Sequence, residues 1–312
     1  MWDFSASGNI ICMGSIIMDI SVKCEQFPET GETRYTPYPY EVTPGGKGAN
    51  QAIAAARSGG KVRMLGRIAD DLYGYELREN LRQAGIDTDM LIEDKNEKSG
   101  VAFVWVNECG DNQIICSPGV HAKNTADDVK KGLEMMKEGD ILLMTMEFPR
   151  DVLMCAVKLA KEKGGFVIVD PSAAEHYRLD EQMAEYIDII KPNEVEAETI
   201  TGIKVKTRED MERALEFMEE KGISYPLISL GQKGIIYKTG GKVCHEQGIA
   251  VETVDSTAAG DTFIGALACC LAAGKTIEEA IEYGNKAAAK CVQKMGAQAS
   301  IPYAEDIEVH DR

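Results

Sequence analysis

The 312-residue chain has few of the residues that mark several large protein classes. It has four histidines, none at zinc-ligand spacing or beside paired cysteines. Lys and Arg number 34 against 51 Asp and Glu, so the formal net charge is −17 and the surface repels phosphate backbones. These features argue against a zinc site and against nucleic-acid binding. We expect each histidine to be an ordinary surface or loop residue: His121, His176, His245 and His310.

The chain also lacks any Cys-x-x-Cys pair, although it has nine cysteines. Cys269 and Cys270 are adjacent, which suits neither a structural disulfide nor a zinc knuckle. The pattern predicts buried, reduced thiols in a cytosolic protein. Four of the cysteines lie within apolar runs: Cys12, Cys116, Cys155 and Cys291.

Signals for export, membrane insertion and several enzyme classes are missing as well. The N-terminus has no basic region, and the longest apolar helix, near Ile264–Ala273, is too short to span a bilayer. No Gly-x-Ser-x-Gly elbow, dinucleotide fingerprint or Walker A loop occurs. We therefore expect a soluble, cytoplasmic protein with no membrane partner, and a Rossmann-type oxidoreductase is a poor alternative.

What the chain does contain is an alternation of short apolar runs and helical patterns. The helical patterns include an Ala-rich segment after Gly48, Asp151–Lys163 and Thr207–Lys221. This order predicts an α/β fold with parallel strands and crossover helices. The apolar runs are Asn9–Met13, Val62–Ile68, Ile141–Met146, Phe166–Asp170, Ile187–Lys191 and Leu227–Leu230.

Two regions break the alternation. Ile20–Val42 holds extended polar and aromatic segments, and Val101–Ser117 reads as a hairpin that turns at Glu108–Asn112. Both are antiparallel in character, so we expect a small β-sheet that projects from the main sheet. Beside the carboxyl ends of parallel strands it could be a lid. Surface strands without a role are the alternative.

The strongest local signal is Asp255–Asp261, which precedes an apolar helix. The small residues Ala258, Ala259 and Gly260 let the backbone approach a ligand, and the free N–H groups of a helix start attract an anion such as a phosphate. A carboxylate beside a phosphate suggests a base that takes a proton from an attacking hydroxyl. Asp261 alone is equally consistent with a helix cap.

Two further segments carry chemistry. Pro44–Asn50 combines glycines with Asn50, which can donate and accept, and could hold a polyhydroxy substrate or be a plain tight turn. Lys191–Glu196 follows a strand and begins a helix. Asn193 and Glu196 share one helix face, so they could hold a hydrated magnesium near phosphates or form a capping box.

Together and in this order, these motifs resemble the PfkB carbohydrate kinase family, and most of all its ribokinase-like members, over about Asn9–Tyr303. The resemblance implies a ribokinase-like three-layer α/β sandwich with a mostly parallel central sheet and a small β-sheet lid. It implies a single domain over 1–312, lid strands within about 18–43 and 99–118, and a homodimer formed through the lid. It also implies the transfer of the γ-phosphoryl group of ATP, with Mg²⁺, to a sugar hydroxyl.

The resemblance assigns roles to single residues. Asp261 would be the catalytic base, and the backbone of Ala258, Ala259 and Gly260 would form the anion hole. Glu196 would act on Mg²⁺ indirectly. The sugar-binding residues would be Asp19, Gly46, Lys47, Asn50, Glu147 and Asp261. The nucleotide-binding residues would be Asn193, Ser229, Gly231, Gly234 and Asn285.

The tail Lys294–Ser300 resembles a family loop that binds a monovalent cation. By this resemblance K⁺ would order the anion-hole loop, and we expect K⁺ dependence. The implied ligands are Asp255, Thr257, the backbone oxygens of Cys291, Lys294 and Gly296, and the Ser300 hydroxyl.

Two positions depart from the family pattern. Ala258 stands where glycine is frequent, and Ile17 replaces an asparagine that binds sugar hydroxyls. An apolar side chain leaves such a hydroxyl unpaired, at a cost of about 1–3 kcal/mol. We therefore predict an ATP-dependent kinase for the primary hydroxyl of ribose or a related pentose such as 2-deoxyribose. A fructokinase, a nucleoside kinase and a non-catalytic sugar-binding protein on the same fold are the alternatives.

Overall fold

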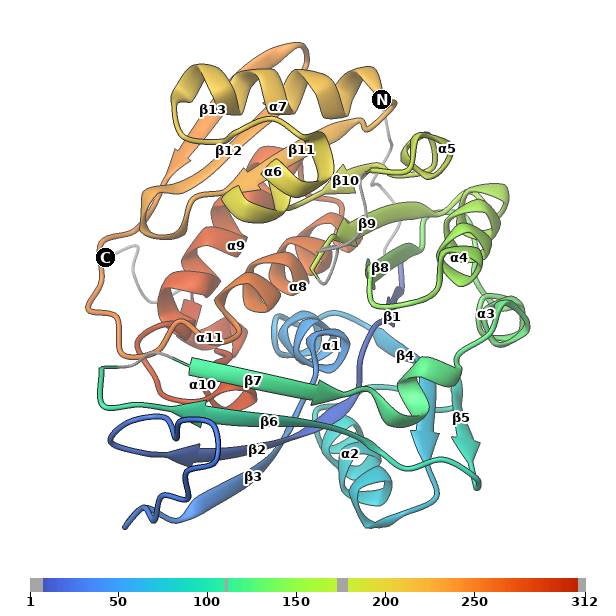
Figure 1. Ribbon diagram of the computed structural model, residues 1–312. Helices are drawn as coiled ribbons and strands as arrows, with labels where there is room; N and C mark the ends of the chain where they lie inside the picture. Colours follow the sequence, from blue (N-terminus) through green and yellow to red (C-terminus); the bar gives the residue numbers. More distant parts are fainter. Residues whose placement is uncertain (1–7, 110–111, 173–178, 308–312) are drawn as a thin grey trace.

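The protein is described here from a computed structural model, which covers residues 8–109, 112–172 and 179–307. A nine-stranded sheet runs through its centre in the order β13-β12-β11-β10-β9-β8-β1-β4-β5 (Figure 1). From β11 to β5 all neighbours are parallel, whereas β12 and β13 are antiparallel additions at one edge. The strands are β1 (Ile10–Met13), β4 (Val62–Ala69), β5 (Leu91–Asp94), β8 (Ile141–Thr145), β9 (Phe166–Asp170), β10 (Ile189–Ile190), β11 (Tyr225–Ser229), β12 (Gly234–Thr239) and β13 (Lys242–Gln247).

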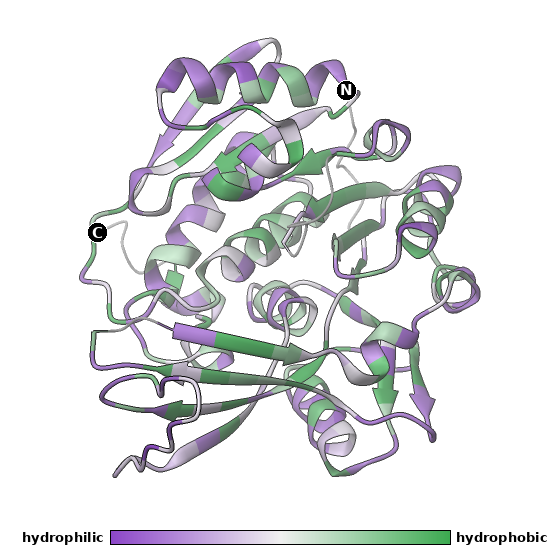
Figure 2. Ribbon diagram, viewed as in Figure 1, coloured by the Kyte–Doolittle hydropathy of each residue, from purple (hydrophilic) through white to green (hydrophobic). Residues whose placement is uncertain are grey.

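Helices cover both faces of this sheet, so the molecule has three layers. In β1, Ile10 and Cys12 pack toward the first helical layer, whereas Ile11 and Met13 pack toward the second. Strands buried on both faces are continuous apolar runs, and Figure 2 shows the central strands in the green of hydrophobic residues. The first layer holds α1 (Lys47–Arg57), α2 (Leu72–Gln83), α8 (Ala259–Ala272) and α9 (Ile277–Cys291). The second holds α3 (Ala126–Gly132), α4 (Arg150–Glu162), α5 (Glu181–Ala184), α6 (Glu194–Thr201) and α7 (Arg208–Glu220). The predicted three-layer α/β fold is confirmed.

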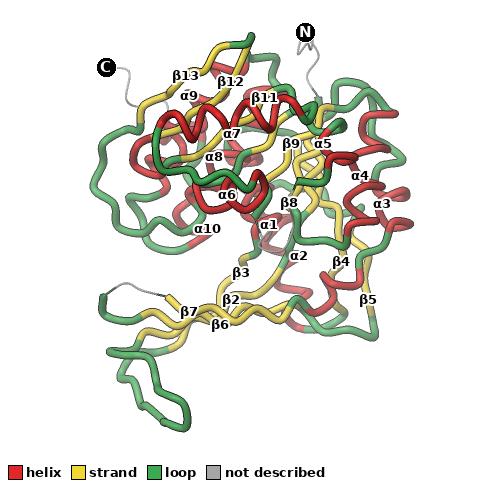
Figure 3. The backbone as a smooth tube through the Cα atoms, turned by 45° about the horizontal axis from the view of Figure 1, so that its top comes forward, coloured by secondary structure: helices red, strands yellow, loops and turns green. Residues whose placement is uncertain are grey.

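A second, four-stranded sheet projects from the main body in the order β3-β2-β6-β7 (Figure 3). Its strands are β2 (Ile17–Lys23), β3 (Tyr40–Gly45), β6 (Gly100–Val106) and β7 (Asn112–Ser117). The pairs β2–β3 and β6–β7 are antiparallel, but β2 and β6 are parallel, so the expectation of antiparallel pairing is wrong for the central pair. The reason is that the chain returns through α1, β4, α2 and β5 before β6 begins, and both strands then run in the same direction. Residues 110 and 111, part of the predicted hairpin turn, lie outside the described residues.

Short elements complete the part of the chain that the structure describes. They are η1 (Gly119–Lys123), η3 (Gly231–Lys233), α10 (Ala297–Ser300) and α11 (Ala304–Ile307). None of the helices within the described ranges combines the length and the apolar character that a bilayer span requires.

Two expectations about single residues are wrong. All nine cysteines are free, but they are not all buried: Cys109 is exposed just before β7, and Cys116 is exposed in β7, an edge strand whose residues are all exposed. His121 is buried, not on the surface: its Nε2 lies 3.1 Å from the Glu147 carbonyl oxygen and its ring packs on Phe148. His176 and His310 lie outside the described residues.

Candidate active site

The carboxyl end of β1 meets the start of α1 at very short range. A Cβ atom on Gly14 would lie 2.6 Å from the Cα of Gly48, and one on Gly46, which has a φ of +93°, would lie 2.5 Å from the Ser15 carbonyl oxygen. The Lys47 N–H donates to the Ser15 hydroxyl at 3.0 Å. Glycine is therefore required here by the packing, and the turn brings the first residues of α1 to the edge of the sheet.

Asp261 lies in the first turn of α8 and is held from α1. Asn50 donates to its Oδ2 and Gln51 to its Oδ1, both at 3.0 Å. The two helices approach closely because Gly265, one turn after Asp261, has no Cβ: that atom would lie 2.4 Å from the Gln51 carbonyl oxygen. Burial raises the pKa of Asp261 to about 6, against the lowering effect of Lys47 and together with the negative charge of Asp170.

The turn before α8 has an unusual backbone. Ala258 has a φ of +60°, the one positive φ of a non-glycine residue among those described. It stands at the N-cap without a side-chain hydrogen bond. In the described part of the chain, the N–H groups of Gly260 and Asp261 have no hydrogen-bond acceptor. Free N–H groups at a helix start favour an anion.

A second buried carboxylate, Asp170, ends β9. Its Oδ2 accepts from Gln51 at 3.0 Å, and its Oδ1 accepts from the Ser172 N–H at 3.0 Å. Lys191 Nζ lies 3.8 Å from Oδ2. Sequence reasoning missed Gln51, Asp170 and the site position of Lys191. A buried carboxylate at the carboxyl end of a parallel strand, and a Gln next to Asn50, were the available signals.

The small sheet contributes Asp19, which faces this cluster. Burial and the negative charge of Asp261 together raise the pKa of Asp19 to about 6, against the lowering effect of Lys47. Burial lowers the pKa of Lys47, but nearby carboxylates outweigh this effect and raise it overall. These carboxylates belong to Asp261, Asp170, Glu147 and Glu196. Residues predicted to bind the sugar are therefore brought together around Asp261.

Glu147 and Gly45 complete this part of the site. The Glu147 Oε2 accepts from the Ser15 N–H at 3.0 Å and from the Thr145 hydroxyl at 2.8 Å. A Cβ on Gly45 would lie 2.1 Å from the Asp19 Oδ2, so this glycine leaves the space that the Asp19 carboxylate occupies.

Asn193 and Glu196 form the capping box of α6, in which each side chain accepts from the other residue's backbone N–H at 2.8 Å. The structure therefore contains the capping box that was one of the two interpretations of this segment. Burial raises the pKa of Glu196, and the charge of Asp170 adds to this effect. Because Glu196 lies near the negative charge of Asp170, this part of the site favours a bound cation.

The residues predicted to bind the nucleotide form a continuous path. Asn193 forms a β-bridge with Ser229. Gly231 and Gly234 have φ angles of +57° and +90° in the turn that follows. A Cβ on Gly234 would lie 2.1 Å from the Glu246 carbonyl oxygen in β13. Asn285, on α9, donates to the Gln247 carbonyl oxygen at 2.7 Å.

The residues predicted to bind a monovalent cation are also in contact. Asp255 accepts from the Thr257 N–H at 2.9 Å and from the Gly296 N–H at 2.9 Å. The Cys291 Sγ lies 3.0 Å from the Ser300 hydroxyl oxygen. Lys294 donates its N–H to the Cys291 carbonyl oxygen at 3.1 Å. Across the described residues, no group of three or more His, Cys, Asp or Glu side chains could hold a metal ion.

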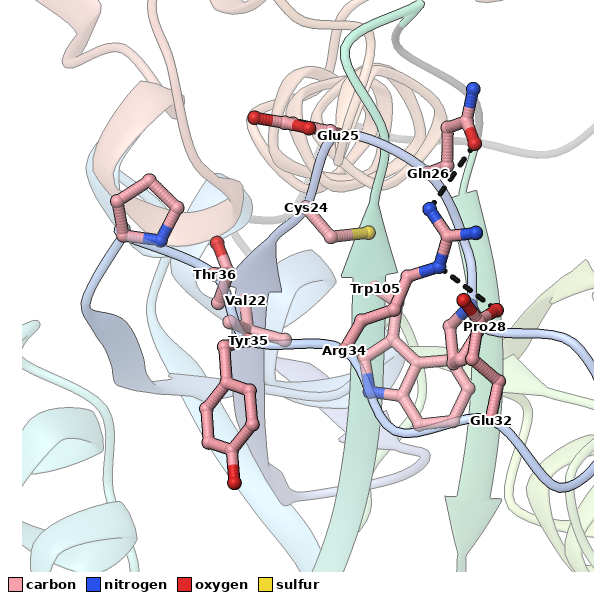
Figure 4. A pocket seen from close by; sticks show the side chains of 11 residues that line it. Val22, Cys24, Glu25, Gln26, Pro28, Glu32, Arg34, Tyr35, Thr36 and Trp105 are labelled. Atoms are coloured by element: carbon pink, nitrogen blue, oxygen red, sulfur yellow. Dashed lines mark hydrogen bonds and ion pairs between the residues drawn. The ribbon is translucent and has the colours of Figure 1, made fainter.

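A separate hollow of about 520 Å³ lies on the small sheet, away from this cluster (Figure 4). Val22 and Trp105 line it from the strands, and the segment from Cys24 to Pro37 closes it. Arg34 spans the hollow with a hydrogen bond to Gln26 and an ion pair to Glu32.

Comparison with known proteins bears on this geometry. The chain is 37% identical to a ribokinase from Haemophilus influenzae, over 94% of this chain and 95% of that protein. It is 31% identical to a deoxyribokinase from Salmonella typhi, over 95% and 96% of the two chains. Among solved structures, it superposes on an Arabidopsis thaliana ribokinase complexed with ribose and ATP with a TM-score of 0.88, 30% identity and coverage of 96% and 97%.

The model of the family described as pfkB family carbohydrate kinase matches residues 7–304. Members of this family are phosphotransferases that act on an alcohol group. The chain belongs to the pfkB family of carbohydrate kinases.

Proposed function

We propose that the protein is an ATP-dependent kinase that transfers the γ-phosphoryl group to the primary hydroxyl of ribose or a related pentose such as 2-deoxyribose. The observation that carries this proposal is Asp261, a buried carboxylate held by two amides directly beside the free N–H groups of a helix start. The named ribokinase and deoxyribokinase relatives support the choice of sugar.

Asp261 acts as the base. With a pKa of about 6 it is ionised at neutral pH and basic enough to accept a hydroxyl proton. The turn Ala258–Gly260 leads to the N–H groups of Gly260 and Asp261, which have no acceptor among the described residues and receive the negative charge of the phosphoryl group. The Ala259 N–H already donates to the Ser256 carbonyl oxygen at 3.2 Å. Fixed amides need no reorganisation during transfer, so positioning and charge stabilisation supply most of the acceleration.

An unpaired acceptor on Asn50 supports the assignment of a polyhydroxy substrate. Its Nδ2 donates to Asp261, whereas its Oδ1 is buried and has no partner among the described residues. A buried acceptor without a donor is costly, and a sugar hydroxyl would supply one. We assign Asp19, Gly46, Lys47 and Glu147 to the same sugar site.

The nucleotide lies along the path from Asn193 through Ser229, Gly231 and Gly234 to Asn285. The oxygen donors of Asn193 and Glu196 fit a hydrated Mg²⁺, which would supply charge neutralisation to the phosphates. The capping box uses the Glu196 Oε2 and one lone pair of the Asn193 Oδ1. The Glu196 Oε1 and the second lone pair of the Asn193 oxygen can still face the hydrated ion.

The linked residues around Asp255 fit a hard monovalent cation, because they offer a carboxylate, hydroxyls and backbone carbonyls. K⁺ bound by Asp255, Thr257, Cys291, Lys294, Gly296 and Ser300 would order the loop that leads to Ala258. Activity should therefore rise on adding K⁺. Equal activity in K⁺ and in tetramethylammonium would contradict this assignment.

Ile17 bears on the choice between pentoses. It is 7% exposed at the start of β2, and a Cβ on Gly100 would lie 2.5 Å from its Cγ2. It brings no hydrogen-bond donor or acceptor to the place where ribokinase-like chains have an asparagine. We propose a preference for 2-deoxyribose, which lacks a hydroxyl to be left unpaired. A kcat/KM at least tenfold higher for ribose would contradict this preference.

The small sheet serves as a lid on one face and a dimer interface on the other. Side chains alternate along β2, so if Asp19 faces the site, Ile20 and Val22 lie on the opposite face of the sheet. The outer face carries apolar side chains in register with them: Tyr40, Val42, Phe103, Trp105 and Ile115. Phe103→Glu should convert a dimer to a monomer in sedimentation velocity; a wild-type monomer would rule out this interface.

The activity is tested by ADP release with ribose, 2-deoxyribose, fructose and several nucleosides, each with and without K⁺. The proposal predicts turnover with a pentose. Turnover confined to fructose or to nucleosides would replace the pentose assignment, and no ADP release with any acceptor would favour a sugar-binding protein.

A further inference from the structure

We infer that Gln51 is a positioning residue, which fixes the Asp261 carboxylate by sharing one amide group between Asp261 and the buried carboxylate of Asp170. The inference rests on the proposed role of Asp261 as the base. It concerns two residues, Gln51 and Asp170, that have no part in the sugar, nucleotide or cation assignments above.

The geometry uses the whole donor capacity of one side chain. The Gln51 Nε2 lies 3.0 Å from the Asp261 Oδ1 and 3.0 Å from the Asp170 Oδ2. An amide nitrogen has two hydrogens, so each carboxylate receives one. Gln51 is 1% exposed, and water does not compete for these bonds.

Asp170 determines which way the amide faces. If the Gln51 amide group rotated so that its oxygen and nitrogen exchanged places, the amide oxygen would face the Asp261 carboxylate and repel it. Asp170 prevents this rotation because it accepts only from the Nε2 side, and the Ser172 N–H holds its other oxygen at 3.0 Å. The consequence is a base with a single orientation: Asn50 fixes Oδ2 and Gln51 fixes Oδ1.

Gln51 and Asp170 shift the pKa of Asp261 in opposite directions. The hydrogen bond from Gln51 lowers the pKa of Asp261, whereas the negative charge of Asp170 raises it. The other titratable groups that face Asp261 are Lys47 on α1, Asp19 on β2 and Cys291 on α9. Lys191 faces Asp170 from the end of β10.

The first test is Gln51→Met, which keeps the length and approximate volume of the side chain but removes both donors. We expect kcat to fall by about tenfold to a hundredfold because the base loses its alignment, while KM for ATP stays within about threefold. The acid limb of the kcat profile should move to higher pH.

The second test is Asp170→Asn, which keeps an acceptor for the Gln51 amide but removes the charge. Its acid limb should move to lower pH, opposite to the shift in Gln51→Met. Asp188→Asn is the matched control, because Asp188 is also a buried carboxylate with a lysine partner, Lys161, but lies outside the site. Asp188→Asn should change the thermal stability and leave the acid limb of the kcat profile at the same pH.

Three outcomes overturn the inference: an unchanged kcat in folded Gln51→Met, a loss of kcat without any shift of the acid limb, or the same shift in Asp188→Asn. The first would mean that Gln51 only fills space, the second that it does not act on the Asp261 carboxylate, and the third that the shift is not specific to the site. The proposed function fails in a different way, through a wild-type protein that phosphorylates no pentose or an Asp261→Asn variant that still turns over.

Discussion

The large sheet and the small sheet differ in how far their apolar side chains are buried. Leu143, in β8, is 1% exposed between two helical layers, whereas Ile115, in β7, is 62% exposed on the outer face of the small sheet. The large sheet is complete within one chain and can hold buried charges such as Asp261 and Asp170 in place. The small sheet has one face toward the site, and its other, apolar face is only partly covered: the segment Cys24–Pro37 lies over Val22 and Trp105, whereas Phe103 is 43% exposed.

The largest expected effect concerns the buried side of this comparison. Asp261→Asn removes the proposed base but keeps the shape of the side chain, so kcat should fall by about a thousandfold or more. ATP affinity, measured by calorimetry, should stay within a few fold. Turnover close to that of the wild type would mean that Asp261 is not the base.

The two sheets should also differ in their contribution to stability. Leu143→Ala leaves a cavity in the large sheet and should lower the free energy of unfolding by about 2–5 kcal/mol. Ile115→Ala should change it by about 0.5 kcal/mol or less in urea denaturation of dilute protein. Equal losses would show that the outer face of the small sheet is as well packed as the core.

The charges that face the site should make stability depend on pH. Burial raises the folded pKa of Asp19 from 3.8 to about 6, so the folded state binds this proton more tightly than the unfolded state. The contribution of Asp19 to stability is therefore largest below its unfolded pKa and is lost as pH rises through about 6. Asp19→Asn should gain stability relative to wild type between pH 4 and 7, by an amount on the order of 1 kcal/mol.

Measured by urea unfolding across this range, a variant that loses relative stability as pH rises would contradict the raised pKa. Turnover should follow the same group of carboxylates. Because Asp261 must be ionised to act as a base and its pKa is about 6, kcat/KM should rise through that pH.

The junction between the two sheets should set the sugar preference. Ile17→Asn restores a side chain that can hydrogen-bond a hydroxyl and should raise the ratio of kcat/KM for ribose over 2-deoxyribose by about tenfold. The reverse change in this ratio, or none, would show that Ile17 does not contact the sugar.

The smallest expected effect is at the turn before α8. Ala258 has a φ of +60°, which costs a residue with a Cβ about 1 kcal/mol. Ala258→Gly should therefore raise the free energy of unfolding by up to about 1 kcal/mol. A destabilised variant would show that the Ala258 methyl group makes packing contacts that outweigh the strain.

Much of the fold could be predicted because its signals are local. The run Phe166–Asp170 forms β9 with the predicted bounds, and the pattern Thr207–Lys221 contains α7, with Thr207 as its cap. The parallel pairing of β2 with β6 could not be predicted, because it joins segments that lie about 80 residues apart and depends on the path of the chain between them. Likewise, the burial of His121 depends on Glu147 and Phe148, which no local pattern connects to it.

By itself the sequence determined the three motifs and their local geometry: glycines at the turn before α1, the capping box at Asn193, and a carboxylate at the start of α8. These depend on the chemistry of neighbouring residues. Only the tertiary structure decided that Gln51 joins Asp261 to Asp170, because those bonds span 210 and 119 residues and exist only where α1 packs on α8 beside the end of β9. The local chemistry points to the reaction class, and the packing orients the Asp261 carboxylate.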